Sequence, residues 1–181
     1  MDVKKAIKKR RSIRKYRDKK ISNVLVKELI NAARLAPSAY NAQPSRFFIV
    51  KSISVKQKLK ENNIFKQDFV YTAPIIIVCC ADQNVFPKER FEPIYSNPRE
   101  IGGELGAVRD LSIATQNLVL RATELGLGTC YVGLVNRNKI KEILAIPKNC
   151  VVPFVITVGY PAEKPKPTPR KKLKEFVMNK F

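Results

Sequence analysis

The sequence predicts a single domain that mixes α-helices with β-strands, and two apolar patterns carry this prediction. One is a stripe at helical spacing after Ser22, a residue type favoured at helix N-caps. The stripe consists of Val26, Leu29, Ile30 and Ala33. The other is the run from Ile75 to Ala81, which is apolar throughout and typical of a central strand buried on both faces. A length of 181 residues matches one domain, so we expect residues 1–181 to fold as a unit.

A short helix is predicted at the start of the chain. Asp2 caps it, and it ends near Arg10. The apolar side chains expected to face inward are Val3, Ala6 and Ile7.

Further elements follow from apolar spacing. Strands are expected at residues 46–51 and 151–159, a helix at residues 54–62, and another helix after its N-cap Asn136. The longest helix, residues 106–125, is apolar nearly all round, so we expect it to be buried within the core or between subunits.

The end of the chain reads as an extended arm, residues 161–181. Pro161, Pro165, Pro167 and Pro169 enforce an extended backbone, and a basic cluster follows at residues 170–172. The last residues are too apolar for a free tail, so we expect them to pack on this subunit or on a partner. These apolar residues are Leu173, Phe176, Val177 and Phe181.

The absence of histidine excludes several kinds of active site. A Ser-His-Asp triad, a Cys-His dyad and every His-ligated metal site are ruled out. The four cysteines form no Cys-x-x-Cys pair, so we predict no metal site and expect them to be reduced core residues. They are Cys79, Cys80, Cys130 and Cys150. If the protein is an enzyme, a bound cofactor carries its chemistry.

The formal net charge of +20 is concentrated at the two ends of the chain. Residues 1–20 hold eleven Lys or Arg, and residues 164–181 hold seven more. Three interpretations are open: basic tails that bind nucleic acid or a membrane surface, two ends that converge on a phosphate, or lysine-rich surfaces that reflect genome composition or a hot habitat. The longest apolar run is too short to span a membrane, and no export signal follows the lysine-rich start, so we expect a cytoplasmic protein.

The arginine segment, residues 10–17, is the first candidate for a binding site. Arg10, Ser12 and Arg14 alternate, so an extended backbone points them to one side while Arg11 points to the other. Guanidinium groups with a hydroxyl between them suit a phosphate or an oxygen-rich ring edge. A solvated basic surface is the alternative.

The 37–43 loop is the second candidate. Pro37 and Pro44 stiffen its ends, and the polar side chains between them suit the edge of a planar ligand that forms hydrogen bonds. Those side chains are Ser38, Tyr40, Asn41 and Gln43. An ordinary helix-to-strand connection rich in turn-forming residues is the alternative.

A glycine-rich stretch, residues 126–133, is the third candidate. Its spacing is Gly-x-Gly-x-x-x-x-Gly and it follows a helix, whereas a Rossmann fingerprint follows a strand, so we reject that fold. Gly126 is predicted to end the helix in a left-handed cap, and the residues after it lead away as a strand or turn that approaches a ligand closely.

These motifs, together with the closing Pro-Arg-Lys-Lys-Leu, resemble the nitroreductase family of FMN-dependent oxidoreductases. The resemblance covers nearly the whole chain in order. It implies an α+β fold with a mixed, mainly antiparallel sheet flanked by helices. It also implies a homodimer with two FMN sites at the interface and C-terminal arms that embrace the partner.

The resemblance assigns the cofactor site residue by residue. Arg10, Arg11, Ser12 and Arg14 hold the phosphate and the pyrimidine edge of the flavin, and Arg170 and Lys172 complete the phosphate site. Residues of the loop line the ring and ribityl chain from the other subunit; they are Pro37, Ser38, Asn41 and Gln43. Backbone groups of Tyr131, Val132 and Gly133 face the flavin N5 region. No protein side chain is assigned as catalytic and no metal is implied, because the flavin carries the chemistry.

The implied activity is transfer of hydride from NADH or NADPH to the flavin and of electrons to a small acceptor such as a nitroaromatic, a quinone or a flavin. Two alternatives stay open: a flavin-binding protein of the same fold without turnover, and a basic nucleic-acid-binding domain. The second has the charge but no standard RNA-binding motif, so neither nucleic acid nor membrane is expected as a partner. Residues 82–99, interpreted as a loop or lid, carry no motif, which leaves the acceptor open.

Overall fold

The computed structural model describes residues 1–86 and 103–178. Four strands form one sheet in the order β1-β2-β4-β3, and each neighbouring pair is antiparallel. The strands are β1 (Ser45–Val50), β2 (Ile75–Asp82), β3 (Gly128–Val132) and β4 (Cys150–Gly159). A parallel pairing occurs outside the named strands, at the isolated bridge between Ser12 and Thr129.

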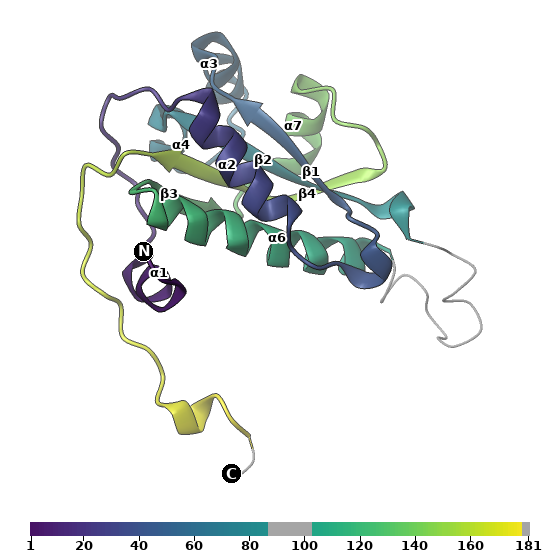
Figure 1. Ribbon diagram of the computed structural model, residues 1–181. Coiled ribbons are helices and arrows are strands. Elements are labelled where there is room, and N and C mark those ends of the chain that lie inside the picture. The colour runs from purple at the N-terminus through teal and green to yellow at the C-terminus, as the bar shows by residue number, and fades with distance from the viewer. Residues whose placement is uncertain (87–102, 179–181) are drawn as a thin grey trace.

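The helices cover both faces of this sheet (Figure 1). They are α1 (Val3–Lys9), α2 (Asn23–Arg34), α3 (Ile53–Glu61), α4 (Phe69–Thr72), α6 (Glu104–Glu124) and α7 (Arg137–Ile143). Three short 3₁₀ turns complete the described elements: η1 (Ala39–Asn41), η2 (Gln83–Val85) and η4 (Leu173–Glu175).

The central strand β2 divides the apolar core into two layers. Ile75, Ile77 and Cys79 face α2 and α6, whereas Ile76, Val78 and Cys80 face the side of α3 and α7. All six side chains are at most 2% exposed, as expected for a strand covered on both faces. The prediction from the run Ile75 to Ala81 is therefore confirmed.

The predicted helix caps are found where the sequence placed them. The side chains of Asp2, Ser22 and Asn136 accept hydrogen bonds from backbone N–H groups in the first turns of α1, α2 and α7. Gly126, just after α6, has a φ of +75°, which confirms the left-handed cap.

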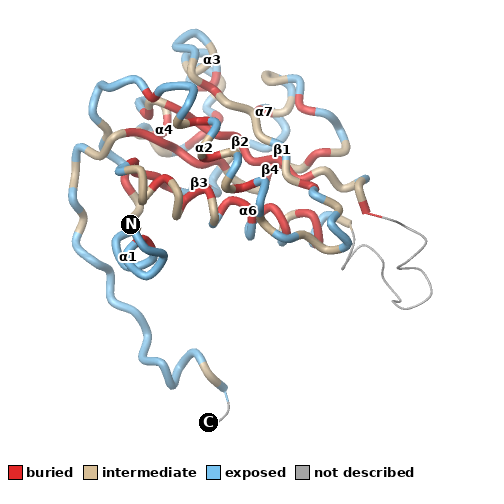
Figure 2. Tube along the Cα trace, in the orientation of Figure 1, coloured by how far each residue is buried: buried red, intermediate tan, exposed pale blue. Residues whose placement is uncertain are grey.

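One expectation about burial was wrong for the single chain, and another is only half met. Val3 and Ile7 are 69% and 58% exposed, so in α1 only Ala6 is buried. Ile113 of α6 is 41% exposed, so the core of one chain does not bury this helix all round, and burial between subunits stays a prediction. In a single chain, α6 covers the sheet with one face and leaves the other free of the core (Figure 2).

The C-terminal arm runs away from the body of the protein after β4 (Figure 1). Its residues are mostly exposed, as the pale blue trace in Figure 2 shows, and Leu173 and Phe176 are 70% and 65% exposed. Leu173 and Phe176 therefore do not pack on their own subunit, and packing on a partner stays a prediction.

Candidate functional site

The arginine segment is joined to the edge of the sheet by backbone hydrogen bonds. The N–H of Ile13 donates to the carbonyl of Thr129 on β3 over 2.9 Å, and the N–H of Arg17 donates to the carbonyl of Tyr160 just after β4 over 2.8 Å. The glycine-rich stretch and the arginine segment, predicted separately, are thus neighbours in space.

Tyr16 connects the segment to the interior of the sheet. Its hydroxyl forms hydrogen bonds with the carbonyl oxygen of Ile13 over 2.5 Å and with Oγ1 of Thr157 over 2.7 Å. Thr157 is fully buried. Burial raises the pKa of Tyr16, so the phenol stays neutral and keeps its proton for these hydrogen bonds.

Three of the predicted binding residues, Arg10, Ser12 and Arg14, influence the ionisation of Cys130 on β3. Burial raises the pKa of the Cys130 thiol, and Arg14, Ser12 and Arg10 all oppose that rise. Arg11, which the alternation placed on the opposite side, instead lines a hollow together with Arg10, whereas Ser12 and Arg14 do not line it, so the predicted alternation is not kept along the whole segment.

The C-terminal arm meets the arginine segment twice. A carboxylate oxygen of Glu163 accepts hydrogen bonds from the N–H groups of Arg14 and Lys15, over 2.5 and 3.1 Å. Farther along, Arg170 lines a hollow of about 370 Å³ together with Arg10 and Arg11. We call this the arginine hollow; its other lining residues are Ile7, Lys8, Gln116, Leu120, Pro167 and Thr168.

The arginine hollow brings both basic ends of the chain together. Among its lining residues there is no carboxylate to neutralise the guanidinium groups. Lys172 is not one of the lining residues: its backbone N–H donates to Glu175 over 2.9 Å, and it is exposed. The structure thus unites Arg170 with Arg10 and Arg11 in one chain and leaves Lys172 apart from them.

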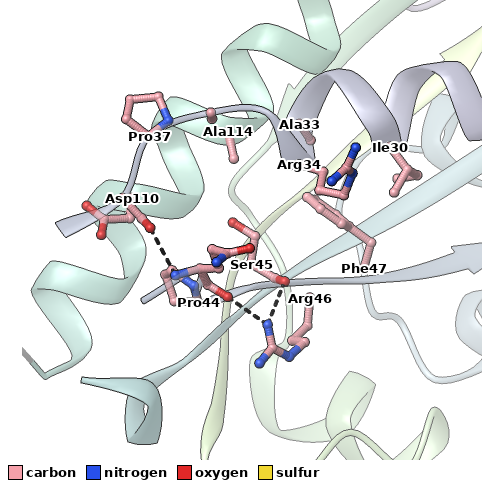
Figure 3. Close-up of a pocket in the computed structure, with 13 residues that line it drawn as sticks. Ile30, Ala33, Arg34, Pro37, Pro44, Ser45, Arg46, Phe47, Asp110 and Ala114 are labelled. Carbon is pink, nitrogen blue, oxygen red and sulfur yellow. Dashed lines mark hydrogen bonds between the residues drawn. The ribbon is translucent and has the colours of Figure 1, made fainter. Parts of the chain in front are cut away.

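The 37–43 loop lies beside a different cavity, of about 260 Å³, near the N-terminal half of α6 (Figure 3). Pro37, Ser38 and Gln43 line it, with Asp110 and Ala114 from α6. This cavity and the arginine hollow share no lining residue. Within one chain, the loop and the arginine segment therefore do not form one site.

The backbone of the loop is strained. Tyr40, Asn41 and Gln43 have φ of 53°, 53° and 49°, in the left-handed region that side chains disfavour. Such a conformation costs of the order of 1 kcal/mol or more for each residue, with Asn tolerating it best. Strain of this kind persists only where surrounding contacts impose it, and it is frequent at binding sites.

The predicted residues of β3 are placed at the same edge as the arginine segment. Burial raises the pKa of Tyr131 to about 12, while the nearby hydroxyl of Thr115 and the charge of Arg10 partly oppose this rise. The Tyr131 residue is 36% exposed and its ring meets Phe154 edge-on, whereas Thr115 is fully buried. Val132 is buried and Gly133 is exposed just beyond the strand.

The sequence model of the nitroreductase family matches residues 7–64 and 61–160 of this chain. The chain belongs to the nitroreductase family. The predicted resemblance is confirmed, and so is the α+β fold that it implied.

Relatives of this nitroreductase-family chain bear oxidoreductase names. A protein of Methanothermobacter thermautotrophicus, provisionally named NADH dehydrogenase/NAD(P)H nitroreductase, is 36% identical over 91% of this chain and 80% of its own length. The FMN reductase [NAD(P)H] of Bacillus subtilis is 31% identical over 93% of this chain and 70% of its own. The solved NADPH:FMN oxidoreductase of Vibrio harveyi complexed with NAD⁺ superimposes with a TM-score of 0.81 at 27% identity, over 97% of this chain and 75% of its own.

The predictions about a lid, a metal site and a membrane span can be compared only with the described residues. The lid interpreted at residues 82–99 lies largely outside the described residues, which stop at 86 and resume at 103. Over residues 1–86 and 103–178, no cluster of His, Cys, Asp or Glu could hold a metal ion, and no helix is long and apolar enough to cross a membrane.

Sequence reasoning missed two carboxylates that organise the site. Glu163 holds the backbone at Arg14 and Lys15, and Asp110 holds the loop through the N–H of Ala39 over 2.8 Å. Asp110 left a signal: it is an acidic residue four positions before Ala114, on the face of the predicted helix expected to be buried. Glu163 left none, because it stands in a proline- and lysine-rich arm where an acidic residue is unremarkable.

Proposed function

We propose that the protein is an FMN-dependent oxidoreductase that takes hydride from NADH or NADPH and passes electrons to a small acceptor such as a nitroaromatic, a quinone or a flavin. Membership of the nitroreductase family and the names of the relatives support the enzyme class and the cofactor. The observation that carries the proposal from this chain is the arginine hollow, which joins Arg10, Arg11 and Arg170 between α1, α6 and the C-terminal arm.

The residues present fit FMN. Guanidinium groups that lack a carboxylate partner are the donors that phosphate oxygens require, and they stand here in a cavity rather than on a flat surface. A second set of polar groups, on the strained loop, offers backbone and amide hydrogen-bonding groups to a ring edge. FMN when bound supplies the acceptance and delivery of hydride at its ring nitrogen N5.

The chain itself binds and orients. Arg10, Arg11 and Arg170 would hold the phosphate, while Ser12 and Arg14 would face the pyrimidine edge, where positive charge favours negative charge on the ring. Backbone groups of residues 131–133 would lie against the N5 region. Lys172, which is outside the arginine hollow in one chain, is assigned to the site by the family motif alone.

We further propose that two copies build each site. Half of the exposed large apolar residues that the structure describes lie on three elements: Val3 and Ile7 of α1, Leu105 and Ile113 of α6, and Leu173, Phe176 and Met178 of the arm. Helices α1 and α6 contact each other, and the arm leaves the body on the side where α1 lies (Figure 1). An isologous contact through this surface would cover these residues and bring the 37–43 loop of one subunit to the arginine hollow of its partner. Cytoplasmic location stays a prediction.

Anaerobic titration tests the proposal directly. The purified protein should be yellow, and NADH or NADPH should bleach it in the absence of dioxygen. A yellow protein that neither nicotinamide bleaches would be a flavin-binding protein without turnover. A colourless protein that binds no added FMN would overturn the proposal.

A further inference from the structure

The 37–43 loop is held together by its own short hydrogen bonds. The N–H of Gln43 donates to Oγ of Ser38 over 2.9 Å, and the N–H of Asn41 donates to the carbonyl of Ser38 over 3.0 Å. These contacts shape the turn. They do not fix where the turn stands relative to the rest of the subunit.

Asp110 supplies a contact from outside the loop. Its Oδ2 accepts the N–H of Ala39, the first residue of η1, over 2.8 Å, and its Oδ1 accepts from Nε of the adjacent Arg109 over 2.9 Å. Figure 3 shows Asp110 on α6 beside the loop segment that carries Pro37. The contact joins residues 71 positions apart in the sequence.

The location of Asp110 is unusual for a carboxylate. The residue is only 3% exposed, and it belongs to a helix whose neighbouring residues Ala107 and Leu111 are fully buried in the core. A buried carboxylate is costly unless charge and hydrogen bonds compensate it, and here a guanidinium and a backbone N–H do so. An apolar residue would pack at this position without that cost, so the carboxylate requires another reason.

Strain in the loop provides that reason. Tyr40, Asn41 and Gln43 are held at positive φ within one to four residues of the Ala39 N–H that Asp110 binds. Without an external tie, the chain would relax to the negative φ that these side chains prefer. We propose that Asp110 is a positioning residue that holds the 37–43 loop in its strained conformation, so that Ser38, Asn41 and Gln43 are preformed for the flavin.

The expected effect on FMN binding rests on the proposed function, whereas the hydrogen bond between Asp110 and Ala39 does not depend on it. Asp110 lies on α6, whose exposed residues Leu105 and Ile113 belong to the proposed subunit interface. By tying the loop to that helix, Asp110 would fix the position of the loop relative to the partner subunit. Loss of the tie should therefore weaken FMN binding by a loss of preorganisation and not by removal of a ligand.

The test compares Asp110→Ala, Asp110→Asn and Ala39→Pro in the full-length protein. Asn keeps an acceptor oxygen of nearly the same size. Proline at 39 removes the N–H donor and leaves Asp110 in place. It suits this position, because Ser38 has the extended φ of −142° and ψ of 153° that precede proline well, and Ala39 opens a 3₁₀ turn. Leu118→Ala, on the same helix and fully buried, is the control for general destabilisation.

Two measurements are made at a temperature where every variant is folded. One is the dissociation constant of FMN, from quenching of its fluorescence. The other is the rate of chymotrypsin cleavage after Tyr40 in flavin-free protein, located by mass spectrometry; Tyr40 is 56% exposed and so accessible once the loop opens.

We expect Asp110→Ala and Ala39→Pro each to weaken FMN binding by about tenfold and to speed cleavage after Tyr40 by a similar factor. Asp110→Asn should stay within about threefold of the wild type, because it preserves the acceptor. The double variant should be no worse than either single one, since both remove the same hydrogen bond.

The proposal would be overturned if Asp110→Ala and Ala39→Pro had the same cleavage rate and the same FMN affinity as Leu118→Ala. It would also be overturned if Asp110→Asn lost as much as Asp110→Ala, because a neutral acceptor should suffice. If wild-type protein bound no FMN, the proposed function would fail, while the cleavage rates would still decide whether Asp110 holds the loop.

Discussion

Ile13 of the arginine segment lies directly over Gly128 of β3. A Cβ atom on Gly128 would stand 2.7 Å from Cγ1 and 2.8 Å from Cβ of Ile13, whose side chain is buried. The arginine segment and β3 are also joined by the hydrogen bond from the N–H of Ile13 to the carbonyl of Thr129. Glycine at 128 is therefore what allows the arginine segment to lie flat against the sheet.

Gly128→Ala should consequently destabilise the protein, by about 1–3 kcal/mol, because overpacking forces a backbone or side-chain shift. Urea unfolding followed by circular dichroism measures the loss. Gly133→Ala is the matched control for stability, since a Cβ there meets nothing within 4 Å. Equal stability of the two variants would show that Ile13 adjusts without cost.

Arg10→Ala and Arg170→Ala should each weaken FMN binding by about tenfold, because each removes a charge-assisted donor from the arginine hollow. The affinity of each variant should also depend less on salt concentration than that of the wild type. Lys166→Ala removes the same charge from the same arm but from a residue that does not line the hollow. If all three variants bound FMN equally, net charge and not the arginine hollow would account for binding.

Ile113→Glu should convert the protein to monomers, because it places a charge in the centre of the proposed interface on α6. Size-exclusion chromatography with light scattering measures the molar mass. Ile53→Glu, at a residue that is 84% exposed on α3, is the control and should leave the mass of the wild type. A wild-type protein that is itself monomeric would contradict the proposed dimer.

Alkaline pH should lower stability through the buried thiols. Burial raises the pKa of Cys80 from 9.0 to about 12 and also raises that of the adjacent, fully buried Cys79. In the unfolded chain these groups lose their protons first, so the folded state binds more protons between about pH 9 and 12. The free energy of unfolding is therefore fully retained below about pH 9 and falls as the pH rises through this window.

Urea unfolding at about pH 8, 9.5 and 10.5 under reducing conditions tests this expectation. Cys80→Ala should lower the stability at every pH through the cavity that it leaves, but it should flatten the dependence on pH because one titrating group is gone. An unchanged slope in this variant would mean that Cys80 ionises equally in the folded and unfolded states.

The sequence by itself determined the local structure of this protein. The two-sided apolar run of β2, the caps at Asp2, Ser22 and Asn136, and the left-handed turn at Gly126 were all predictable, because each depends on residues within a few positions of one another. Three ordered motifs, with the closing basic cluster, were also enough to indicate the nitroreductase family.

Only the tertiary structure decided which distant residues meet. Glu163 binds the backbone of Arg14 across 149 positions, and Asp110 binds that of Ala39 across 71. The tertiary structure also showed that Arg170 lines the arginine hollow together with Arg10, whereas Lys172 does not line it. It showed as well that Val3 and Ile113 are exposed in one chain. The physical reason is that periodicity and capping report the surroundings of a residue along the chain, whereas these contacts depend on how separate elements cross in space.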